Sequence, residues 1–393
     1  MDDVILLDYG MKPTRPPQFP YNGIRPESVI VSHAHLDHAG IVANLMDLSP
    51  EVYMTSVTMG LTHLLARDTI KIGDREGYSP FTAWDLQKLM ERTTFVSYNE
   101  RFRVLDYEVE LFDAGHIPGS ASIFLDGEIR LFYTGDVKTE DTYLLKRAET
   151  NLPDADILII ESTYFGKEHP DRKELEKSFI ESVKETLDRG GNAIVPCFAI
   201  GRTQEIVMML HSHGITPYVD GMGLDALKII EEHPSFLRDG DALVEAFSDA
   251  HWVASKRRKN VLREPSVVVT TAGMLNGGPV LYYLKKIYGD PKSKVFLTGY
   301  QVEGTGGRTL LEKGYIEANG SVIHLKGKVE QYDFSAHSDD SELKKIVMDF
   351  CKRGVQYIFP VHGENTKEFA DWINENLECE AISPENGEEF IIE

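Results

Sequence analysis

The chain has 393 residues, 42% of them hydrophobic, which is enough for two domains that each bury a core. Lys and Arg number 41 and Asp and Glu 63, a net charge of −22. This charge counts against a nucleic-acid partner without excluding one, because a basic groove can lie within an acidic total.

No apolar run reaches the roughly 18 residues of a membrane span, and Met1–Asp3 is acidic rather than a signal sequence, so we expect a cytoplasmic protein with no membrane partner. Three widely spaced cysteines are interpreted as separate thiols in a reducing compartment, and they are Cys197, Cys351 and Cys379.

The N-terminal part predicts two short strands that each end on polar side chains. Residues 4–7 are apolar and end at Asp8, and a proline-rich loop follows over residues 11–26. Ser28–Val31 is apolar and β-branched, as in a buried strand, and it leads directly into His33-Ala-His-Leu-Asp-His38. Apolar residues between positions 41 and 48 predict a helix after this motif.

The motif at 33–38 places four metal-binding side chains within six residues. Imidazole and carboxylate groups together suit zinc and similar divalent ions. His33 and His35 are two residues apart and can converge on one ion, while Asp37 and His38 can reach a second. A surface histidine cluster without metal is the alternative, but the position of the motif at the end of a buried strand favours a metal site.

Polar side chains also follow later apolar segments. Helical patterns cover residues 56–69 and 82–92, and short strands follow over residues 101–136. Each such side chain alone has an ordinary structural explanation, but their repeated placement at strand ends favours one shared site. Besides Asp8 and the 33–38 motif, the set is His116, Asp136, Glu161, His337 and His362.

From about residue 171 the pattern changes to helices that alternate with buried strands. A helix over 172–188 and another over about 201–212 flank an apolar strand at 193–196, and two further buried strands lie at 266–270 and 294–298. Strands separated by helices predict a parallel, Rossmann-like sheet. We therefore expect one α/β domain interrupted by a second.

These motifs together resemble the β-CASP family of metallo-β-lactamase-fold nucleases. The 33–38 motif, His116, Asp136 and Asp8 look like the metal motifs of that fold, and Glu161-Ser-Thr-Tyr, Ser335-Ala-His-Ser-Asp339 and Val361-His-Gly-Glu364 resemble the three β-CASP motifs. The chain most resembles archaeal relatives of the nuclease subunit of the cleavage and polyadenylation factor. The resemblance implies a metallo-β-lactamase αββα sandwich over residues 1–170 and 325–393, interrupted by a Rossmann-like parallel-sheet β-CASP domain over residues 171–324.

The same resemblance implies a site with two zinc ions per chain. His33, His35 and His116 would hold one ion, and Asp37, His38 and His362 the other. Asp136 would bridge the two ions, and Asp8 would orient a ligand.

The same resemblance implies that Asp37, Glu161 and His337 are the catalytic residues. The metal pair would activate a water as a hydroxide that attacks phosphorus. His337, held by Glu161, would protonate the leaving oxygen.

Substrate contacts are less specific. The candidates for phosphate positioning are Ser335, Arg202, Gly306 and Arg308. The dense basic run Lys256-Arg257-Arg258-Lys259 follows Trp252, which predicts either backbone contacts with a stacked base or simply a solvated face.

We expect a zinc-dependent ribonuclease that cuts single-stranded RNA in RNA processing or decay, by endonucleolytic or 5′-exonucleolytic action, with a homodimer left open. Two alternatives stand beside it. A small-molecule hydrolase of the same metal fold would need neither the 171–324 insertion nor His337. A catalytically silent subunit that binds RNA or a partner nuclease would typically lack metal ligands, and this chain keeps all seven.

Overall fold

The computed structural model describes residues 4–12, 14, 17–21, 23–318 and 321–392, so Met1–Asp3 and parts of the predicted proline-rich loop lie outside the described residues. The chain divides into two compact units. The first contains the chain through Asp141, Lys146–Glu168 and the chain from Ala336 onward, and the second contains Thr142–Leu145 and His169–Ser335.

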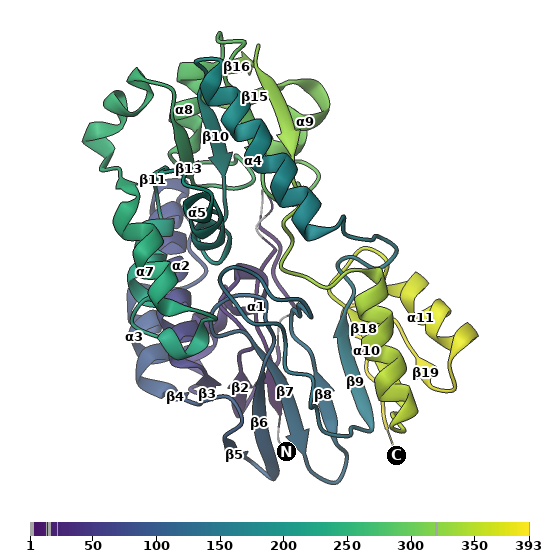
Figure 1. The fold of residues 1–393 in the computed structure, drawn as a ribbon. Coiled ribbons are helices and arrows are strands. Elements are labelled where there is room, and N and C mark those ends of the chain that lie inside the picture. Colours follow the sequence, from purple (N-terminus) through teal and green to yellow (C-terminus); the bar gives the residue numbers. More distant parts are fainter. Residues whose placement is uncertain (1–3, 13, 15–16, 22, 319–320, 393) are drawn as a thin grey trace. The chain divides into compact units, whose positions relative to one another are not determined.

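The first unit is built on two sheets (Figure 1). A four-stranded parallel sheet has the order β1-β2-β3-β4, and its strands are β1 (Ile5–Leu7), β2 (Ser28–Ile30), β3 (Glu51–Met54) and β4 (Thr93–Phe95). A mixed seven-stranded sheet has the order β19-β18-β9-β8-β7-β6-β5. Its strands are β5 (Arg101–Val104), β6 (Tyr107–Asp113), β7 (Ala121–Asp126), β8 (Leu131–Tyr133), β9 (Ile157–Glu161), β18 (Tyr357–Val361) and β19 (Glu380–Ala381).

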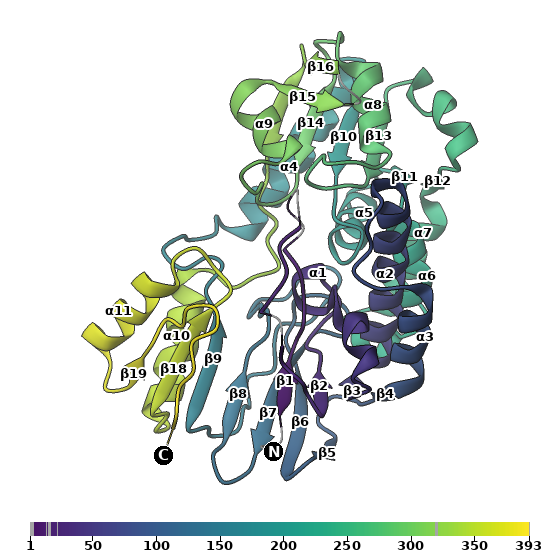
Figure 2. The same cartoon turned by 180° about the vertical axis from the view of Figure 1, so that it is seen from behind.

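Three apolar layers hold the first unit together. Inward-facing side chains such as Ile30 and Leu111 fill the space between the two sheets. The helices α2 (Ser56–Glu76) and α3 (Ala83–Arg92) cover the outer face of the four-stranded sheet. The helices α10 (Asp340–Lys352) and α11 (Thr366–Asn376) cover the outer face of the seven-stranded sheet, as Figure 2 shows from behind. This is the αββα sandwich that the sequence predicts.

Two local predictions for this unit are wrong. The single helix expected over 41–48 is instead the short helix α1 (Leu36–Ala39) followed by the 3₁₀ helix η1 (Val42–Asp47). Of the apolar side chains that suggested a helix, Ile41, Leu45 and Met46 are buried and Leu48 is exposed. The amide of Ile41 is bonded to the carbonyl of Tyr9 rather than within a helix. Helix α2, by contrast, continues past the predicted end and stops at Gly77, which adopts the left-handed conformation that favours glycine (φ 82°).

The cysteine prediction is also corrected. Cys351, in α10, and Cys379, just before β19, form a disulfide with a Cα–Cα distance of 6.0 Å. The two cysteines are 28 positions apart in the sequence, and this spacing does not indicate that the two segments lie in one layer. Cys197 is a free, buried cysteine, and burial raises the pKa of its thiol to about 12.

The second unit is a six-stranded parallel sheet in the order β12-β11-β13-β10-β14-β17. The strands are β10 (Ala193–Pro196), β11 (Tyr218–Asp220), β12 (His251–Trp252), β13 (Val267–Thr270), β14 (Lys294–Leu297) and β17 (Lys328–Gln331). The antiparallel pair β15 (Tyr315–Ala318) and β16 (Ser321–His324) adds a small second sheet. The inner strands β10, β13 and β14 are buried on both faces, which explains why their sequences are almost entirely apolar, with Thr270 and Lys294 as the exceptions.

Helices connect these parallel strands. They are α4 (Arg172–Asp188), α5 (Arg202–Ser212), α6 (Gly223–Ile230), α7 (Gly240–Asp249), α8 (Val280–Ile287) and α9 (Gly306–Lys313), with the 3₁₀ helices η2 (Pro234–Phe236) and η3 (Ser255–Arg263). The second unit continues beyond the predicted insertion, residues 171–324, as far as Ser335, because β17 pairs with β14. Within the described residues we find no helix with both the length and the apolar character that a membrane crossing needs.

Candidate metal and catalytic site

Six strands of the first unit end at or next to the predicted site residues and bring them together. Asp8 follows β1, the 33–38 motif follows β2, and His116, Asp136, Glu161 and His362 lie at or just after the ends of β6, β8, β9 and β18. His337 precedes α10, whose N-cap is Asp339. Three groups of donors result.

The first group is His33, His35, His116 and Asp136. His35 Nδ1 lies 3.2 Å from His33 Nε2 and 3.0 Å from His116 Nε2. Asp136 Oδ2 lies 3.4 Å from each of the two Nε2 atoms. Ligands of a tetrahedral zinc ion with bonds of about 2.0–2.1 Å are about 3.3 Å apart. The four donor atoms therefore have the spacing of a tetrahedral zinc site.

The second group is Asp37, His38 and His362. His362 Nε2 lies 3.2 Å from Asp37 Oδ2, and His38 Nε2 lies 3.3 Å from the other carboxylate oxygen of Asp136, Oδ1. His362 Nδ1 is 3.5 Å from the same Asp136 oxygen. One buried carboxylate therefore faces both groups, with a different oxygen toward each.

Hydrogen bonds fix which ring nitrogen of three histidines faces the site. His38 Nδ1 is 2.7 Å from Asp8 Oδ2 and His116 Nδ1 is 2.8 Å from the carbonyl of Ala336. Because these oxygens only accept, each Nδ1 carries a proton, and Nε2 is the nitrogen that faces the donor groups. His33 Nδ1 is 3.0 Å from Ser32 Oγ, whose hydroxyl donates to Asp8. Asp8 thus orients His38 directly and His33 through Ser32.

Burial and neighbouring charges set the protonation of the histidines. Burial lowers the pKa of His33 and His116 well below the usual value, and it lowers that of His35 to about 4. These three rings are therefore neutral at pH 7, as metal ligands must be. Burial alone would also lower the pKa of His38, but the carboxylates of Asp136 and Asp8 raise it well above the usual value.

The Asp136 carboxylate is buried, and burial by itself would raise its pKa. The surrounding histidines, His362 first among them, instead hold this pKa well below the usual value. The carboxylate is therefore ionised and available as an anionic ligand.

The third group contains the pair Glu161 and His337. His337 Nδ1 lies 3.0 and 2.9 Å from the two oxygens of Glu161, and its Nε2 lies 3.8 Å from Asp136 Oδ2. Glu161 is held in turn by the amide of Val137, which donates to Oε1 at 2.8 Å. Although burial lowers the pKa of His337, Glu161 and then Asp136 raise it above the usual value.

Gly10 allows the backbone to pass close behind the metal loop. The amide of Tyr9 donates to the carbonyl of His38, and the amide of Met11 donates to that of Leu36, both at 2.7 Å. A Cβ at Gly10 would lie 1.9 Å from the backbone carbon and oxygen of Asp37. No side chain fits there without moving a proposed ligand.

Two buried atoms of the site have no hydrogen-bond partner among the described residues. They are His38 Nε2 and Asp136 Oδ1. Buried polar atoms in native proteins are nearly always paired, so these two indicate a missing partner that accepts lone pairs. A divalent cation between them meets this requirement, and the residues present therefore fit a metal.

The similarity of this chain to known protein families agrees with a metal site. Residues 5–189 match the beta-lactamase superfamily domain, residues 203–310 the Beta-Casp domain, and residues 322–384 the Zn-dependent metallo-hydrolase RNA specificity domain. Over 99% of its length the chain is 38% identical to a probable RNase, MJ4, of Methanocaldococcus jannaschii, and the match covers 94% of that protein. The chain belongs to the β-CASP family of metallo-β-lactamase-fold nucleases.

Other relatives of this β-CASP chain carry related names. It is 34% identical to RNase aCSPSF2 of Saccharolobus solfataricus, over 99% of this chain and 80% of that one. It is also 34% identical to the transcription termination factor FttA of M. jannaschii, but it spans only 62% of that longer protein. A crystal structure of a protein of unknown function from Enterococcus faecalis shares the fold, with a TM-score of 0.58 and 16% identity over 97% of this chain and 85% of that one.

The four predicted substrate contacts all lie in the second unit, three of them in the β-CASP insertion and Ser335 after it. Arg308 Nε is bonded to Glu312 at 2.6 Å, and the amide of Gly306 donates to Asn276. Arg202 is buried beside Glu205, and its Nη1 has no hydrogen-bond partner among the described residues. Ser335 is buried as well. The two groups on Gly306 and Arg308 already have partners, and their phosphate role stays a prediction.

The sequence interpretation missed three side chains that support the β-CASP metal groups. Tyr133 donates its hydroxyl to Asp8 Oδ2 at 2.8 Å, Ser32 binds Asp8 with both its amide and its hydroxyl, and Thr163 Oγ1 lies 3.0 Å from His362 Nδ1. Each is within three residues of a predicted site residue in the sequence, His33 for Ser32, Asp136 for Tyr133 and Glu161 for Thr163. That adjacency is the only sequence signal for them.

Proposed function

We propose that this chain is a metal-dependent ribonuclease that hydrolyses phosphodiester bonds of single-stranded RNA, with two zinc ions per chain. The observation that carries the proposal is the position of Asp136. Its two carboxylate oxygens lie 3.3–3.5 Å from the nitrogens of two different donor groups. A carboxylate shared in this way is what a two-metal site requires.

His33, His35 and His116 would hold the first ion, and Asp37, His38 and His362 the second. Zinc, when bound, lowers the pKa of coordinated water and stabilises charge on phosphate oxygens. Asp37 would contribute a negative charge to the site. Burial alone would raise the pKa of this carboxyl, but the hydrogen bond with His362 and the charge of His38 keep it low. The histidines of the first group are neutral, so the first ion would face only the Asp136 carboxylate, and the second ion would face Asp37 as well.

His337 would supply the proton that the leaving ribose oxygen needs. Glu161 contacts Nδ1 with both oxygens, so it fixes this nitrogen as the protonated one and directs Nε2 toward the donor groups. An acid held in this way accelerates the reaction by about 10²–10⁴-fold. Glu161 positions His337 and does not itself reach the reacting atoms.

RNA is the substrate class that the relatives favour. Two relatives that this chain matches over 99% of its length are named RNases, and the domain family that matches residues 322–384 is named for RNA specificity. A small-molecule hydrolase has no use for the Glu161–His337 pair, and a silent subunit has no use for seven intact donors. Roles in RNA processing or decay fit these names.

The test combines metal content with cutting. The purified chain is assayed for zinc by elemental analysis and for cleavage of a 5′-labelled single-stranded RNA, with and without a chelator. Two zinc ions per chain and cutting that chelation abolishes and zinc restores would support the proposal. Bound metal without RNA cutting would favour a small-molecule hydrolase, and a chain that binds no metal would refute the enzyme proposal. The position of the labelled products distinguishes endonucleolytic from 5′-exonucleolytic action.

A further inference from the structure

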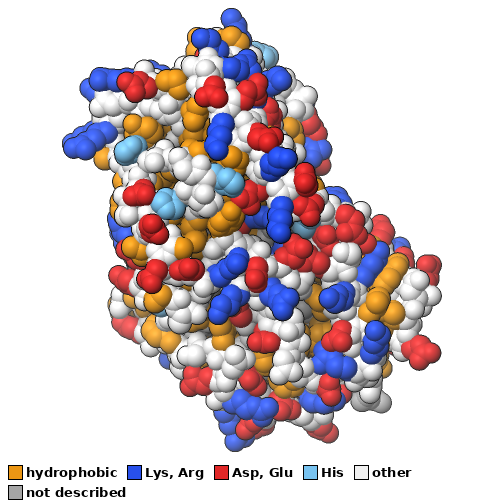
Figure 3. Space-filling model, viewed as in Figure 1, with side chains coloured by type: hydrophobic (Ala, Val, Ile, Leu, Met, Phe, Trp, Pro, Cys, Tyr) orange, Lys and Arg blue, Asp and Glu red, His pale blue; other side chains and the backbone are white. Residues whose placement is uncertain are grey.

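The edge of the parallel sheet in the second unit carries a concentration of positive charge. Residues 251–263 contain five Lys and Arg side chains and no carboxylate, in a chain whose net charge is −22. They form β12 and η3. Figure 3 shows Lys and Arg side chains projecting from this segment, which Figure 1 draws in green.

One of these cations has a structural role. Arg258 donates from Nε and Nη2 to the buried Asp220, at 2.6 and 2.9 Å, and Tyr283 donates to the same carboxylate at 2.7 Å. Arg258 is therefore not available to a ligand. Of the four cations in the basic run 256–259, three remain that a ligand could contact. Lys256, Arg257 and Lys259 are exposed, and no ion pair involves them in the part of the chain that the structure describes.

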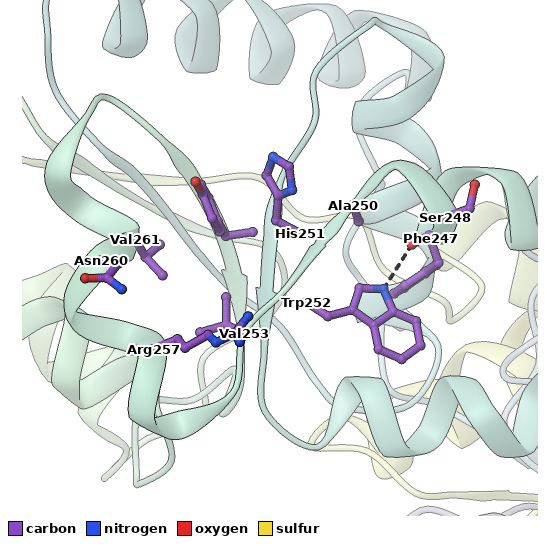
Figure 4. A pocket seen from close by; sticks show the side chains of 10 residues that line it. Phe247, Ser248, Ala250, His251, Trp252, Val253, Arg257, Asn260 and Val261 are labelled. Carbon is purple, nitrogen blue, oxygen red and sulfur yellow. Dashed lines mark hydrogen bonds between the residues drawn. The ribbon is translucent and has the colours of Figure 1, made fainter.

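A cavity of about 520 Å³ opens between this segment and α7, and Figure 4 shows its lining. This volume lies within the roughly 300–1,000 Å³ of ordinary ligand sites. Aromatic rings line it on both sides of β12. His251 packs on Tyr218 with ring centroids 4.8 Å apart, and the Trp252 indole lies on the α7 side.

Trp252 is held in place but keeps an accessible ring. Its Nε1 donates to the carbonyl of Phe247 at 2.9 Å, so the polar atom of the indole is already bonded. The side chain is nevertheless 47% exposed. An immobilised aromatic face with no unsatisfied polar atom suits stacking on a planar base rather than hydrogen-bond readout.

The backbone adds a further donor. The amides of His251 and Val253 are bonded to the carbonyls of Pro217 and Val219 on β11. Because successive residues of a strand point their amides to opposite sides, the amide of Trp252 faces away from β11 at the open edge of the sheet. Trp252 precedes the first of the three exposed cations, Lys256, by four residues.

We propose that Trp252, Lys256, Arg257 and Lys259, here called the edge patch, form a binding subsite for single-stranded RNA. One base stacks on Trp252, and the cations contact the flanking phosphates. The inference rests on the proposed ribonuclease function and adds to it a place where the substrate strand is held by the second unit alone. Charge complementarity selects this occupant. Three exposed cations follow an aromatic ring in one segment of an acidic chain, and one of them, Arg257, lines the same cavity as Trp252. Such a segment attracts a strand that offers both phosphates and bases.

The test compares matched variants of the zinc-loaded full chain. The triple variant K256A/R257A/K259A removes the three cations, and K313A/K326A/K328A removes three exposed lysines elsewhere in the same unit as a control. Trp252→Ala removes the stacking ring, and Trp252→Phe keeps an aromatic face. Stopped-flow anisotropy with a labelled single-stranded RNA measures affinity before cutting, and a gel of the same samples measures cleavage.

We expect the edge-patch triple variant to weaken binding and to reduce the slope of log affinity against log salt by about 2, since each phosphate contact on a single strand contributes about 0.7. Trp252→Ala should weaken binding roughly 5- to 150-fold, and Trp252→Phe should restore most of it. The control triple variant should keep the wild-type slope. Circular dichroism of each variant confirms that the fold is retained.

Three outcomes would overturn the inference. Equal effects of the two triple variants would show that only total charge matters. Unchanged affinity of Trp252→Ala would remove the stacking role. Polyglutamate is tested as a competitor of the labelled RNA for the edge patch. If it competes as well as unlabelled RNA does, and the same variants lose this competition, the partner is an acidic protein instead. Failure of the ribonuclease proposal looks different, because the wild-type chain would then leave RNA uncut whatever the edge-patch variants do to binding.

Discussion

Replacing Asp8 by Asn should weaken the second metal position more than the first. Asp8 Oδ2 accepts from Ser32 Oγ, Tyr133 OH and His38 Nδ1 at 2.7, 2.8 and 2.7 Å, while Oδ1 accepts the amide of Ser32 at 2.6 Å. Asparagine has the same shape and tolerates the left-handed backbone that Asp8 adopts (φ 62°). If its oxygen keeps the Ser32 amide, its NH₂ group must face three donors.

The two hydroxyls can rotate to accept from the new NH₂ group, but the proton on His38 Nδ1 has no such freedom. The ring must shift that proton to Nε2, the atom that faces Asp136. A protonated Nε2 cannot bind a cation. Ser32 Oγ still has a lone pair for His33 Nδ1, so the first donor group is preserved. Loss of a partner that orients a metal ligand typically costs about 10–100-fold in metal affinity, or about 1.4–2.7 kcal/mol.

The assay is a zinc titration against a fluorescent chelator, with cleavage of labelled RNA measured at each zinc level. Asp8→Asn should bind one zinc as the wild type does and the second about 10–100-fold more weakly, and excess zinc should recover part of the activity. Asp371→Asn, at an exposed carboxylate on α11, is the control. Two zinc ions bound with wild-type affinities in Asp8→Asn would refute the tautomer argument.

Three other substitutions test separate parts of the structure. His337→Ala should keep its zinc and lose about 10²–10⁴-fold in cleavage rate, measured at saturating RNA. Gly10→Ala should displace the metal loop and lower zinc occupancy, whereas Gly289→Ala, which meets no atom within 4 Å, should leave occupancy unchanged. Arg258→Ala should leave the buried Asp220 without its cation and lower the free energy of unfolding by roughly 3 kcal/mol, measured in urea.

Each of these three has a result that would contradict it. Cleavage within severalfold of the wild type would show that His337 is not the proton donor. Full zinc occupancy in Gly10→Ala would mean that the backbone behind the metal loop can yield without moving Asp37. An unchanged urea midpoint for Arg258→Ala would show that its ion pair with Asp220 contributes nothing, and Arg258 would then be free to act as a fourth cation of the basic segment.

The sequence predicted the donor set because each donor follows a strand, and the ends of neighbouring strands lie at one edge of a sheet. β8, β9 and β18 are neighbours in the seven-stranded sheet, so Asp136, Glu161 and His362 meet although more than 200 residues separate the first from the last. The apolar strands marked these three residues as candidates, and the family resemblance supplied their assignment to one site.

The same reasoning failed where contacts are not periodic. Nothing in the spacing of Asp8 and His38 indicates that one carboxylate also binds Ser32 and Tyr133, because these contacts depend on how the two sheets face each other. The helix expected over 41–48 failed for a related reason. Three of its four apolar residues, Ile41, Leu45 and Met46, are buried, but the segment forms a 3₁₀ helix and the amide of Ile41 is bonded to Tyr9 after β1.

The net charge was the strongest argument from the sequence against RNA as a substrate. The distribution of charge in the structure makes this argument weaker. Charge acts locally, because salt screens exposed charges that are more than about 8 Å apart at physiological ionic strength. The carboxylates of the site face histidines and the proposed ions, so they do not repel a substrate as free charges would. The exposed cations at β12 and η3 have no carboxylate neighbours in residues 251–263. A negative total is therefore compatible with a positive surface where a strand would bind, and the salt dependence of binding should follow those few cations and not the total.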